Sequence, residues 1–480
     1  MLLQSQNRAR GFRQEHDSLG EKDIPIDAYW GIHTSRALDN FQLSEMRLSQ
    51  FPALLRAYGS IKLAAARANE RLGVLTAEKA EAIESACRDL ESGSLDAQFP
   101  IDVFQGGAGT STNMNVNEVI ANRALEHLNR SKGDYEALHP NDDVNLSQST
   151  NDTYPTAVRI ATLHLHKEYR KALCALATAL DERGVAFSDI IKLGRTQLQD
   201  AVPMTLGQEF KAFASAIRRD VRNGDLIVGN LHEINLGGTA IGTGINAPDG
   251  YAAAVISELS KLTGLPLKLA DDLVSASWDV SALVLCSGWL KQSALTLSKL
   301  ANDLRLLSSG PRGGIGEIIV PSVQAGSSIM PGKVNPVIAE AINQIAFQVV
   351  GNDVAIGMAA EAGQLQLNEM EPLIAFNLLS SLQLLINGVD TLTTRCISGI
   401  SANPNVCRQY LDRSVCLATA LVPLLGYEIA ARMANDALQS GKTIRNTVIE
   451  HGLMGALEAD NALDAGRMLG EMKTSAAIRA

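Results

Sequence analysis

Apolar residues recur at steps of three, four and seven along much of the chain, which is the spacing of one face of an α-helix. The clearest stripe lies between residues 278 and 308 and comprises Leu283, Leu290, Leu297, Leu300, Leu304 and Leu307. At a rise of about 1.5 Å per residue, a helix over this stretch would be about 45 Å long, longer than a small domain is wide. Helices this long and striped usually pack side by side in a bundle.

Three further stretches show the same helical spacing. Their apolar positions are Leu165, Tyr169, Leu173, Leu176 and Leu180; Ile338, Ile342, Ile345 and Val349; and Phe376, Leu379, Leu382, Leu385, Val389 and Leu392. Hydrophobic residues make up 46% of the chain but aromatic residues only 4%, a balance toward Ala and Leu that favours helices over strands. We therefore predict an all-α protein. Several stretches carry apolar residues beyond one stripe, so we also expect a homo-oligomer that covers the second face.

The first part of the chain is less regular. Residues 1–14 contain three arginines and no acid, and they lack the hydrophobic stretch of a secretory signal, which predicts a disordered extension. Residues 17–41 show no sustained period and are predicted to form an irregular arm, in which Arg36 is expected to be a structural pairing residue or, as a second interpretation, to bind a carboxylate. A helical pattern rich in alanine then runs from Leu54 to Leu90 and is interrupted at Gly73.

The length of 480 residues allows two or three domains, and we predict three. The first is a mostly helical domain with its irregular arm, residues 1–148, and the second is the long-helix domain, residues 149–402. The turn-rich residues 401–405 mark the second boundary, and residues 403–480 are expected to form a small helical domain.

Composition excludes several classes of function. The net charge of -10 and the pI near 5.4 argue against nucleic acid as a partner, because such binding needs a basic surface. No run of about 18 apolar residues occurs, so no membrane partner is expected. The cysteines are Cys87, Cys174, Cys286, Cys396, Cys407 and Cys416. They show neither CxxC nor zinc-ligand spacing, so no metal site is predicted and free, mostly buried thiols in a reducing cytoplasm are expected.

Four segments stand out because hydroxyl, amide and charged side chains gather in them. They are residues 105–117, 139–156, 194–209 and 326–336, and each precedes or opens into a helical pattern. The last one holds two serines, a lysine, an asparagine, two glycines and two prolines, which predicts an ordered but mobile loop before a helix. Such a loop can hold a carboxylate or a phosphate at the helix N-terminus. A polar surface loop explains its local composition equally well.

Together these segments resemble the signature regions of the aspartase/fumarase superfamily, whose enzymes release fumarate by eliminating ammonia, water or an amine. The four segments occur in the family's order, and the resemblance covers nearly the whole chain. It implies a three-domain fold whose central bundle of long helices tetramerises into a larger helical core, with each active site shared by three subunits. It implies no required cofactor, with a divalent cation such as magnesium as the activator to consider, and a cytoplasmic location.

The resemblance also implies roles for individual residues. Ser327 would be the general base that removes the Cβ proton of L-aspartate, working as an oxyanion in a closed, dry site. The β-carboxylate and its dianionic enediolate would be held by Thr110, Ser149, Thr150 and Ser328. The α-carboxylate would be held by Thr196, Lys333 and Asn335. The amino group would be oriented by Asn151 and Gln197. No acid is assigned to the departure of ammonia.

A second, non-catalytic dicarboxylate site of the fumarase branch matches His139, Asn141 and Asp142. For His139 a structural role is the preferred interpretation, and the dicarboxylate role is the second.

The branch within the superfamily is indicated by Gln197 and Gln199. Fumarases usually carry a histidine where this chain has Gln197, paired with a glutamate that corresponds to Glu340, so here the pair is lost. Together with Gln199 this favours ammonia as the leaving group. The alternatives are fumarate hydration, elimination from N-substituted aspartates such as argininosuccinate, and a catalytically silent relative that serves as a structural protein. The last predicts degraded polar loops, whereas these loops are intact.

Overall fold

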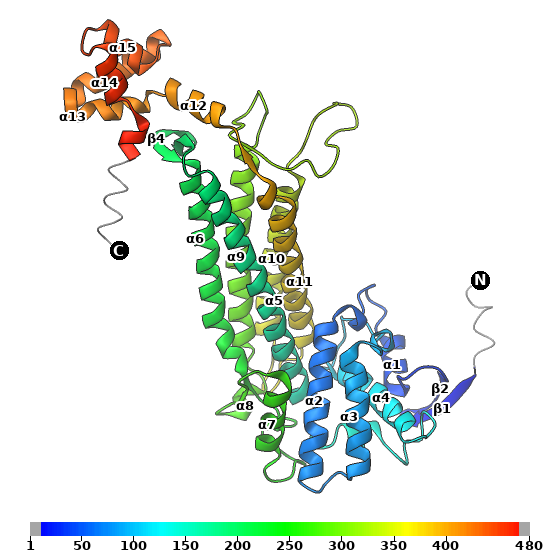
Figure 1. Cartoon of the computed structure of the whole chain (residues 1–480). Coiled ribbons are helices and arrows are strands. Elements are labelled where there is room, and N and C mark those ends of the chain that lie inside the picture. The colour runs from blue at the N-terminus through cyan, green and yellow to red at the C-terminus, as the bar shows by residue number, and fades with distance from the viewer. Residues whose placement is uncertain (1–10, 470–480) are drawn as a thin grey trace. The chain divides into compact units, whose positions relative to one another are not determined.

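The computed structural model describes residues 11–469, and α-helices make up most of this part of the chain (Figure 1). Its strands pair two by two. The antiparallel pairs are β1 (Phe12–Asp17) with β2 (Gly20–Pro25), β3 (Ile191–Thr196) with β4 (Gln199–Thr205), and β7 (Ile318–Ile319) with β8 (Ser401–Ala402). The parallel pair is β5 (Glu233–Ile234) with β6 (Lys268–Leu269). These short two-stranded sheets lie in the segments outside the helices. The predicted all-α fold is confirmed.

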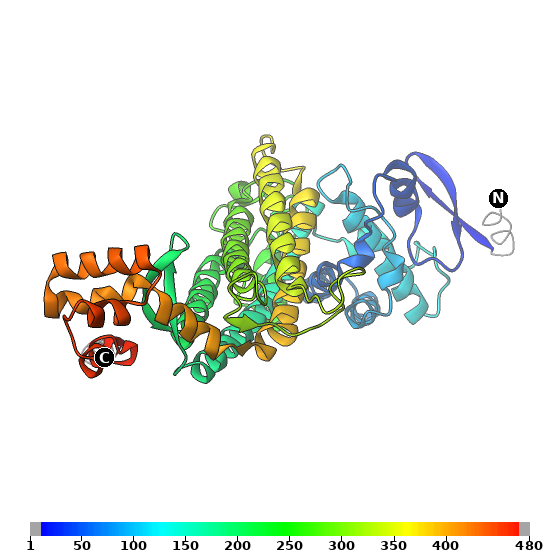
Figure 2. The ribbon, with the colours of Figure 1, turned by 90° about the horizontal axis from the view of Figure 1, so that it is seen from above.

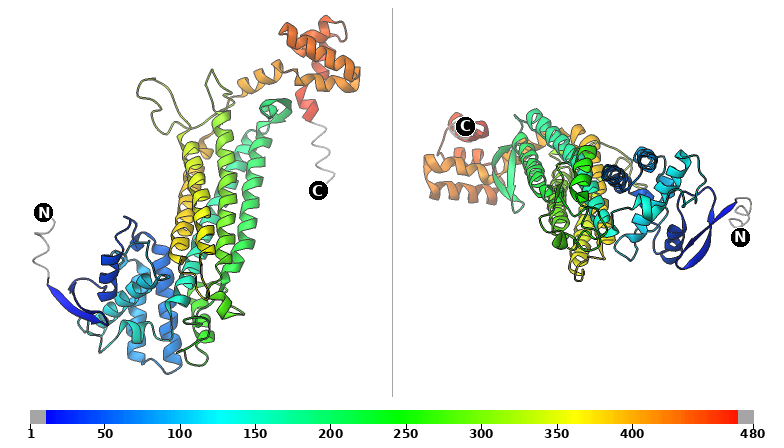
Figure 3. Two further views of the ribbon diagram at one scale, coloured as in Figure 1. Left: turned by 180° about the vertical axis from the view of Figure 1, so that it is seen from behind. Right: turned by 90° about the horizontal axis from the view of Figure 1, so that it is seen from below.

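Five long helices run side by side, as the views in Figures 1 and 3 agree. They are α5 (Thr150–Ala186), α6 (Leu206–Ile227), α9 (Ser281–Leu307), α10 (Val337–Glu361) and α11 (Glu371–Arg395). Figure 2 shows the same helices seen from above, where their ribbons lie next to one another. The helices predicted from the leucine and isoleucine stripes are therefore confirmed, and α10 begins directly after Pro336 as expected.

The chain divides into two compact units, and each long helix contributes to both. The first unit comprises the described residues up to Arg170 together with residues 222–292 and 347–386, and the second comprises residues 171–221, 293–346 and those from 387 onward. In the first unit the Trp289 ring of α9 packs against the Tyr169 ring of α5, with centroids 5.6 Å apart. In the second, Asn343 Nδ2 of α10 donates to Ser298 Oγ of α9 over 2.8 Å. The three-domain division at residues 148 and 402 stays a prediction.

One helical stretch of the described chain, Glu371–Gly399, is long and apolar enough to cross a membrane by length and composition alone. Of its most apolar window, 61% is buried inside the protein. The core helix of a bundle passes the same test, and we interpret α11 in this way.

The first unit is completed by shorter helices. They are α1 (Ile32–Asn40), α2 (Pro52–Arg71), α3 (Ala77–Ser92), α4 (Thr110–His127), α7 (Tyr251–Thr263) and α8 (Leu273–Ala276). The predicted interruption at Gly73 is confirmed, because this glycine has a φ of +76° between α2 and α3. Single turns are η2 (Leu48–Gln50), η3 (Asp96–Gln98), η5 (Val228–His232) and the π-helical η4 (Pro140–Val144).

The N-terminal prediction needs two corrections. Residues 1–10 lie outside the described residues, but Phe12 and Arg13 belong to β1 rather than to a disordered extension, and the Arg13 guanidinium donates to the Ala28 and Trp30 carbonyls. Residues 17–41 form the β1–β2 hairpin and α1 instead of an irregular arm. Arg36 of this segment pairs with Asp17 through Nε and Nη2, both 2.7 Å from its carboxylate oxygens.

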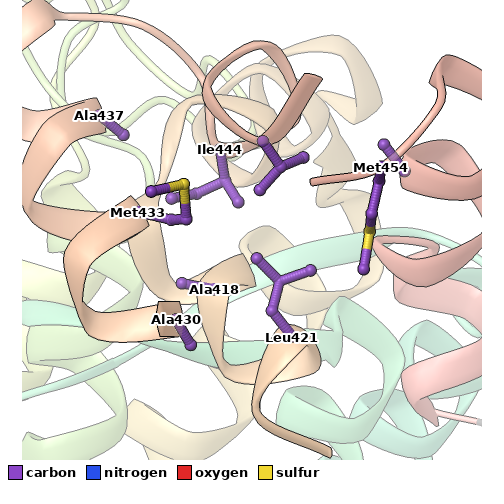
Figure 4. Packing of buried hydrophobic residues seen from close by; sticks show 9 residues of the cluster. Ala418, Leu421, Ala430, Met433, Ala437, Ile444 and Met454 are labelled. Atoms are coloured by element: carbon purple, nitrogen blue, oxygen red, sulfur yellow. The ribbon is translucent and has the colours of Figure 1, made fainter. Parts of the chain in front are cut away.

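The last part of the second unit is a small helical cluster. Its elements are η6 (Ile397–Gly399), α12 (Pro404–Arg413), η7 (Val415–Leu421), α13 (Val422–Leu425), α14 (Tyr427–Ser440), α15 (Ile444–Glu450) and α16 (Ala456–Ala462). Figure 4 shows its buried centre, where Leu421 of η7 and Met433 of α14 meet Ile444 of α15 and Met454. Burial of these side chains stabilises the cluster by roughly 1.5–3 kcal/mol for each.

Candidate functional site

The loop between β7 and α10 is closed at its base by its own hydrogen bonds. Gly326 N donates to the Lys333 carbonyl over 3.0 Å, and Asn335 Nδ2 donates to the Gly326 carbonyl over 2.8 Å. A side chain at position 326 would place its Cβ 2.2 Å from the Lys333 carbonyl oxygen, so only glycine fits there. An open cavity of about 570 Å³ lies against the loop and is lined by residues 322–327 and 330–334.

Ser327 is oriented by this loop as a hydrogen-bond acceptor. Its Oγ receives the backbone N–H groups of Ile329, over 3.2 Å, and Met330, over 2.9 Å. Donors that point at an oxygen favour its charged form. The two donors therefore stabilise a serine oxyanion at this position relative to a serine without them.

The loop does not by itself exclude solvent. Ser327 and Asn335 are half-buried, Ser328 and Lys333 are exposed, and 83% of the Ile329 side chain is accessible. An apolar side chain at the tip of a polar loop is well suited to contact another surface. A dry pocket around Ser327 thus requires a covering surface from outside the loop.

Thr196 and Gln197 lie at the tip of the β3–β4 hairpin. The segment 194–209 was predicted to be a loop that opens into a helix, and it proves to be this hairpin followed by α6. Gln197 and Leu198 have φ values of +55° and +61°, the geometry of a two-residue turn between twisted strands. Both candidate side chains are exposed there and are free to reach a ligand.

Thr110 stands at the N-terminus of α4. The polar segment was predicted to be a loop as far as residue 117, but α4 already begins at Thr110. Gly109 precedes it with a φ of +86°, and a Cβ there would lie 2.1 Å from the Tyr154 ring. The close packing of this glycine lets α4 start at the surface with an exposed Thr110.

Ser149, Thr150 and Asn151 surround the N-terminus of α5. The two helix starts are joined, because Asn113 Nδ2 in the first turn of α4 donates to Thr150 Oγ1 over 3.2 Å. Helix N-termini present free N–H groups and a partial positive charge. The first unit therefore brings Thr110 and Ser149–Asn151 together at two helix ends that can accept a carboxylate.

The fixed geometry of this helix start depends on residues that sequence reasoning did not single out. Asp152 is fully buried, and its carboxylate accepts the N–H groups of Ser149, Gly237 and Thr239. Asn151 Nδ2 in turn donates to the Ala240 carbonyl over 2.7 Å. Asp152 adjoins the residues singled out in segment 139–156. Nothing in the sequence near Asp152, however, indicates that it contacts residues 237–240.

Lys62 of α2 is a second group that was missed. It is buried, and its ammonium donates to Asn145 Oδ1 and Gln148 Oε1, each over 2.9 Å. Burial lowers the pKa of Lys62 to about 7, although the Asp152 carboxylate acts in the opposite direction. Burial likewise raises the pKa of Asp152 to about 6, against the backbone donors that it accepts.

The lowered pKa of Lys62 predicts a dependence of stability on pH. Between about pH 7 and pH 10.5 the unfolded chain binds a proton at Lys62 that the folded chain does not, so the free energy of unfolding should rise with pH. Lys62→Met should flatten this rise, as measured by urea unfolding at several pH values in the window. Lys261→Met, at an exposed position of α7, is the control that should keep the slope. An unchanged slope in Lys62→Met would contradict the assignment.

The candidates for a second site lie at η4. His139 caps this π-helical turn, because its Nδ1 accepts the backbone N–H groups of Asn141 and Asp142 over 3.1 and 3.2 Å. Asn141 and Asp142 are exposed beside it. His139 therefore has the structural role that was one of its two interpretations, and its role in binding a dicarboxylate stays a prediction. Within residues 11–469 no group of three or more His, Cys, Asp or Glu side chains is placed to hold a metal ion.

Comparison with known proteins gives consistent results over nearly the full length of the chain. A family model described as lyase matches residues 20–351, and one described as fumarase C C-terminus matches residues 417–470. Curated relatives named aspartate ammonia-lyase are 52% identical in Pseudomonas fluorescens, with 98% of both chains covered, and 46% identical in Escherichia coli K12, with 96% of this chain and 97% of the relative covered.

Solved structures of the same family are also similar to this chain. A fumarate lyase:delta crystallin of Brucella melitensis, bound to cobalt, matches with a TM-score of 0.93 and 56% identity over 95% of this chain and 99% of its own. A class II fumarase of Schistosoma mansoni matches with a TM-score of 0.89 and 34% identity over 95% and 98%.

Proposed function

Because the chain belongs to the lyase family of aspartases and class II fumarases, we propose that it is an aspartate ammonia-lyase, which eliminates ammonia from L-aspartate to give fumarate. The carrying observation is the similarity to curated aspartate ammonia-lyases at 46–54% identity over nearly the whole chain, against 34% for the class II fumarase. Gln197 in place of the fumarase histidine supports the same choice.

The proposed reaction begins at the signature loop. Ser327 Oγ takes the Cβ proton, and the electron pair moves into the β-carboxylate as a dianionic enediolate. The backbone N–H groups of Ile329 and Met330 support the serine oxyanion before it accepts the proton. The enediolate then collapses to a carbon–carbon double bond and breaks the C–N bond. The substrate's –NH3⁺ group takes the electron pair of that bond and leaves as neutral NH3, so no further proton is needed.

The remaining candidates hold the two carboxylates. The β-carboxylate is bound at the N-termini of α4 and α5 by Thr110, Ser149 and Thr150. Ser328 of the loop also binds it. Donors preorganised toward a growing charge stabilise it by several kcal/mol, and loss of one costs roughly 2.7–4 kcal/mol. The α-carboxylate is bound by the remaining donors of the loop and the hairpin, which are Lys333, Asn335 and Thr196. Asn151 and Gln197 orient the amino group.

We further propose that the site forms only in a homotetramer, with three subunits contributing. The surface of α10 supports the proposal that several subunits assemble. Its residues Phe347, Val354 and Met358 lie at helical spacing and are 66%, 59% and 70% exposed. An apolar stripe of this kind on a bundle helix indicates a surface covered by another copy. A covering subunit would also shield Ile329 and dry the pocket at Ser327.

The closure of the signature loop can be tested at Gly326. Gly326→Ala should lower kcat/KM about 100-fold or more, because a Cβ would collide with the Lys333 carbonyl and open the loop. Gly455→Ala, at an exposed position directly before α16 with open space around it and a φ of -72°, adds the same methyl group without a collision. If both variants keep full turnover of L-aspartate, the loop closure is not needed for activity.

The proposed function itself is tested by release of fumarate from three substrates. Purified protein should produce fumarate from L-aspartate much faster than from L-malate or argininosuccinate. Faster turnover of L-malate would identify a fumarate hydratase instead, and the same protein preparation serves all three assays.

Enzymes of this family need no organic cofactor. Activation by a divalent cation such as magnesium and location in the cytoplasm stay predictions. The first is checked by assays with and without a chelator, and the second by fractionation of the source cells.

A further inference from the structure

A proline near the start of α5 removes one of the hydrogen bonds of this helix. Pro155 has no backbone N–H, so the Asn151 carbonyl, four residues earlier, lacks its usual helical partner. Asn235 supplies a donor in its place, because its Nδ2 donates to the Asn151 carbonyl over 2.9 Å. Asn235 follows β5, lies 84 positions later in the sequence and is buried. The start of α5 therefore depends on a contact from outside the helix.

The side chain of Asn151 is held by the same outside segment. Its Nδ2 donates to the Ala240 carbonyl over 2.7 Å. A carbonyl oxygen can only accept a hydrogen bond, so the amide atom that faces Ala240 must be the nitrogen of Asn151. Within residues 11–469 no donor contacts the Asn151 Oδ1, and the residue is half-buried. The amide therefore offers an acceptor, and not a donor, to a ligand.

The segment 235–240 is itself held in place. The Asp152 carboxylate accepts the N–H groups of Gly237 and Thr239 over 3.0 and 2.9 Å. A Cβ at Gly237 would lie 2.6 Å from the Cβ of Ala252, so the segment packs directly against α7. Thr239 has a φ of +55°, which is rare for a β-branched residue and persists only where the surroundings enforce it. The Ala240 carbonyl thus projects from a fixed backbone.

We propose that Asn235 is a positioning residue for the amino group of the substrate, because it fixes Asn151 with its Oδ1 toward the –NH3⁺ group; this inference rests on the proposed lyase function. An ammonium group has donors and no acceptor, so it pairs with the amide oxygen and not with the amide nitrogen. Asn235 and Asn151 belong to the same unit of one chain, together with Ser149 and Thr150. The arrangement therefore serves a single site, whichever other subunits complete that site.

The test compares two ligands that differ only in the amino group. In the Ser327→Ala background L-aspartate is not turned over, so calorimetry gives dissociation constants for both L-aspartate and succinate. Asn235→Ala should weaken binding of L-aspartate about tenfold, the size of one hydrogen bond to a charged group, but binding of succinate less than about twofold. A merely structural role would weaken both, because both carry the β-carboxylate assigned to Ser149 and Thr150. Equal weakening of the two ligands, or none, would overturn the proposal.

Restoring the helical donor checks the route by which Asn235 acts. Pro155→Ala supplies an N–H for the Asn151 carbonyl, so Asn235→Ala in that background should weaken binding of L-aspartate less than about threefold. A loss of about tenfold that persists there would show that Asn235 does not act through this carbonyl, and it would overturn the proposal. Asn235→Ser, which shortens the side chain but keeps it polar, should show the same selective loss and serves if Asn235→Ala does not fold.

The matched control is Asn122→Ala in α4. Asn122 is also buried, and its Nδ2 donates to the Tyr29 carbonyl over 2.8 Å. Its loss should leave the ratio of the two dissociation constants unchanged, and an equal change of that ratio would overturn the proposal.

The binding measurements also separate this inference from the proposed function. Selective loss of L-aspartate binding in Asn235→Ala, with a wild-type protein that releases no fumarate, would refute the lyase function but support the positioning role. Equal loss of both ligands, with a wild-type protein that releases fumarate, would refute the positioning role alone.

Discussion

Replacing Ser327 by alanine is expected to lower kcat for release of fumarate by about 10³-fold or more, because general-base catalysis contributes roughly 10²–10⁴-fold and water cannot reach the Cβ proton in a closed site. The removed oxygen is the one that accepts two backbone N–H groups, so the variant leaves these two donors without a partner. It removes none of the residues that are assigned to binding the substrate carboxylates. Binding of a substrate analogue should therefore be nearly unchanged.

The measurements are steady-state release of fumarate and calorimetric binding of succinate, a dicarboxylate without the leaving group. Ser328→Ala is the graded comparison, since it removes one hydroxyl assigned to the β-carboxylate and should weaken both binding and turnover. Equal losses of binding and turnover in Ser327→Ala would point to a structural role for this hydroxyl and remove it as the base.

The long helices could be predicted from the sequence because their stability comes from apolar stripes that local spacing reveals. The segment 17–41 could not, because the start of α1 is held from far away. The buried carboxylate of Glu118 in α4 accepts the N–H groups of Gly31, His33 and Thr34. No periodicity in residues 31–40 indicates a partner about 85 positions later, so the segment was interpreted as irregular.

Segment 105–117 was misjudged for a related reason. Its asparagines suggest a loop, yet Asn113 and Asn117 are buried in α4, and the amide nitrogens of both donate to Asn145 Oδ1. Lys62 donates to the same oxygen. A buried polar group is tolerated in a helix when a partner satisfies it, and that partner lies on another element.

The candidate residues of the site could be named from their segments, but their assembly could not be derived. Ser149, Thr150 and Asn151 surround the start of α5, while Thr196 follows its end. The helix has 37 residues, and at about 1.5 Å per residue it is about 55 Å long. A straight helix of that length keeps the groups at its two ends apart, which is why a shared site between subunits follows from the proposed mechanism.

Two inactive variants should therefore restore activity when they are combined. Ser327→Ala lacks the base, and the double variant Ser149→Ala/Thr150→Val lacks two donors for the enediolate, each worth roughly 2.7–4 kcal/mol. If Ser327 and Ser149–Thr150 of one site come from different subunits, random hybrids of the two chains contain some fully intact sites. Equal mixing should give about one quarter of the wild-type activity in a closed symmetric oligomer.

The decisive control pairs Ser327→Ala with Lys333→Ala. These residues share one loop, so every site in such hybrids receives a defective loop from whichever subunit supplies it, and activity should not return. The hybrids are made by joint unfolding and refolding, and their composition is checked by tagging one of the two chains. Lack of recovery in the first mixture, with hybrid oligomers present, would mean that each chain builds its own complete site. The α10 stripe with Phe347, Val354 and Met358 would then have to be explained by assembly alone.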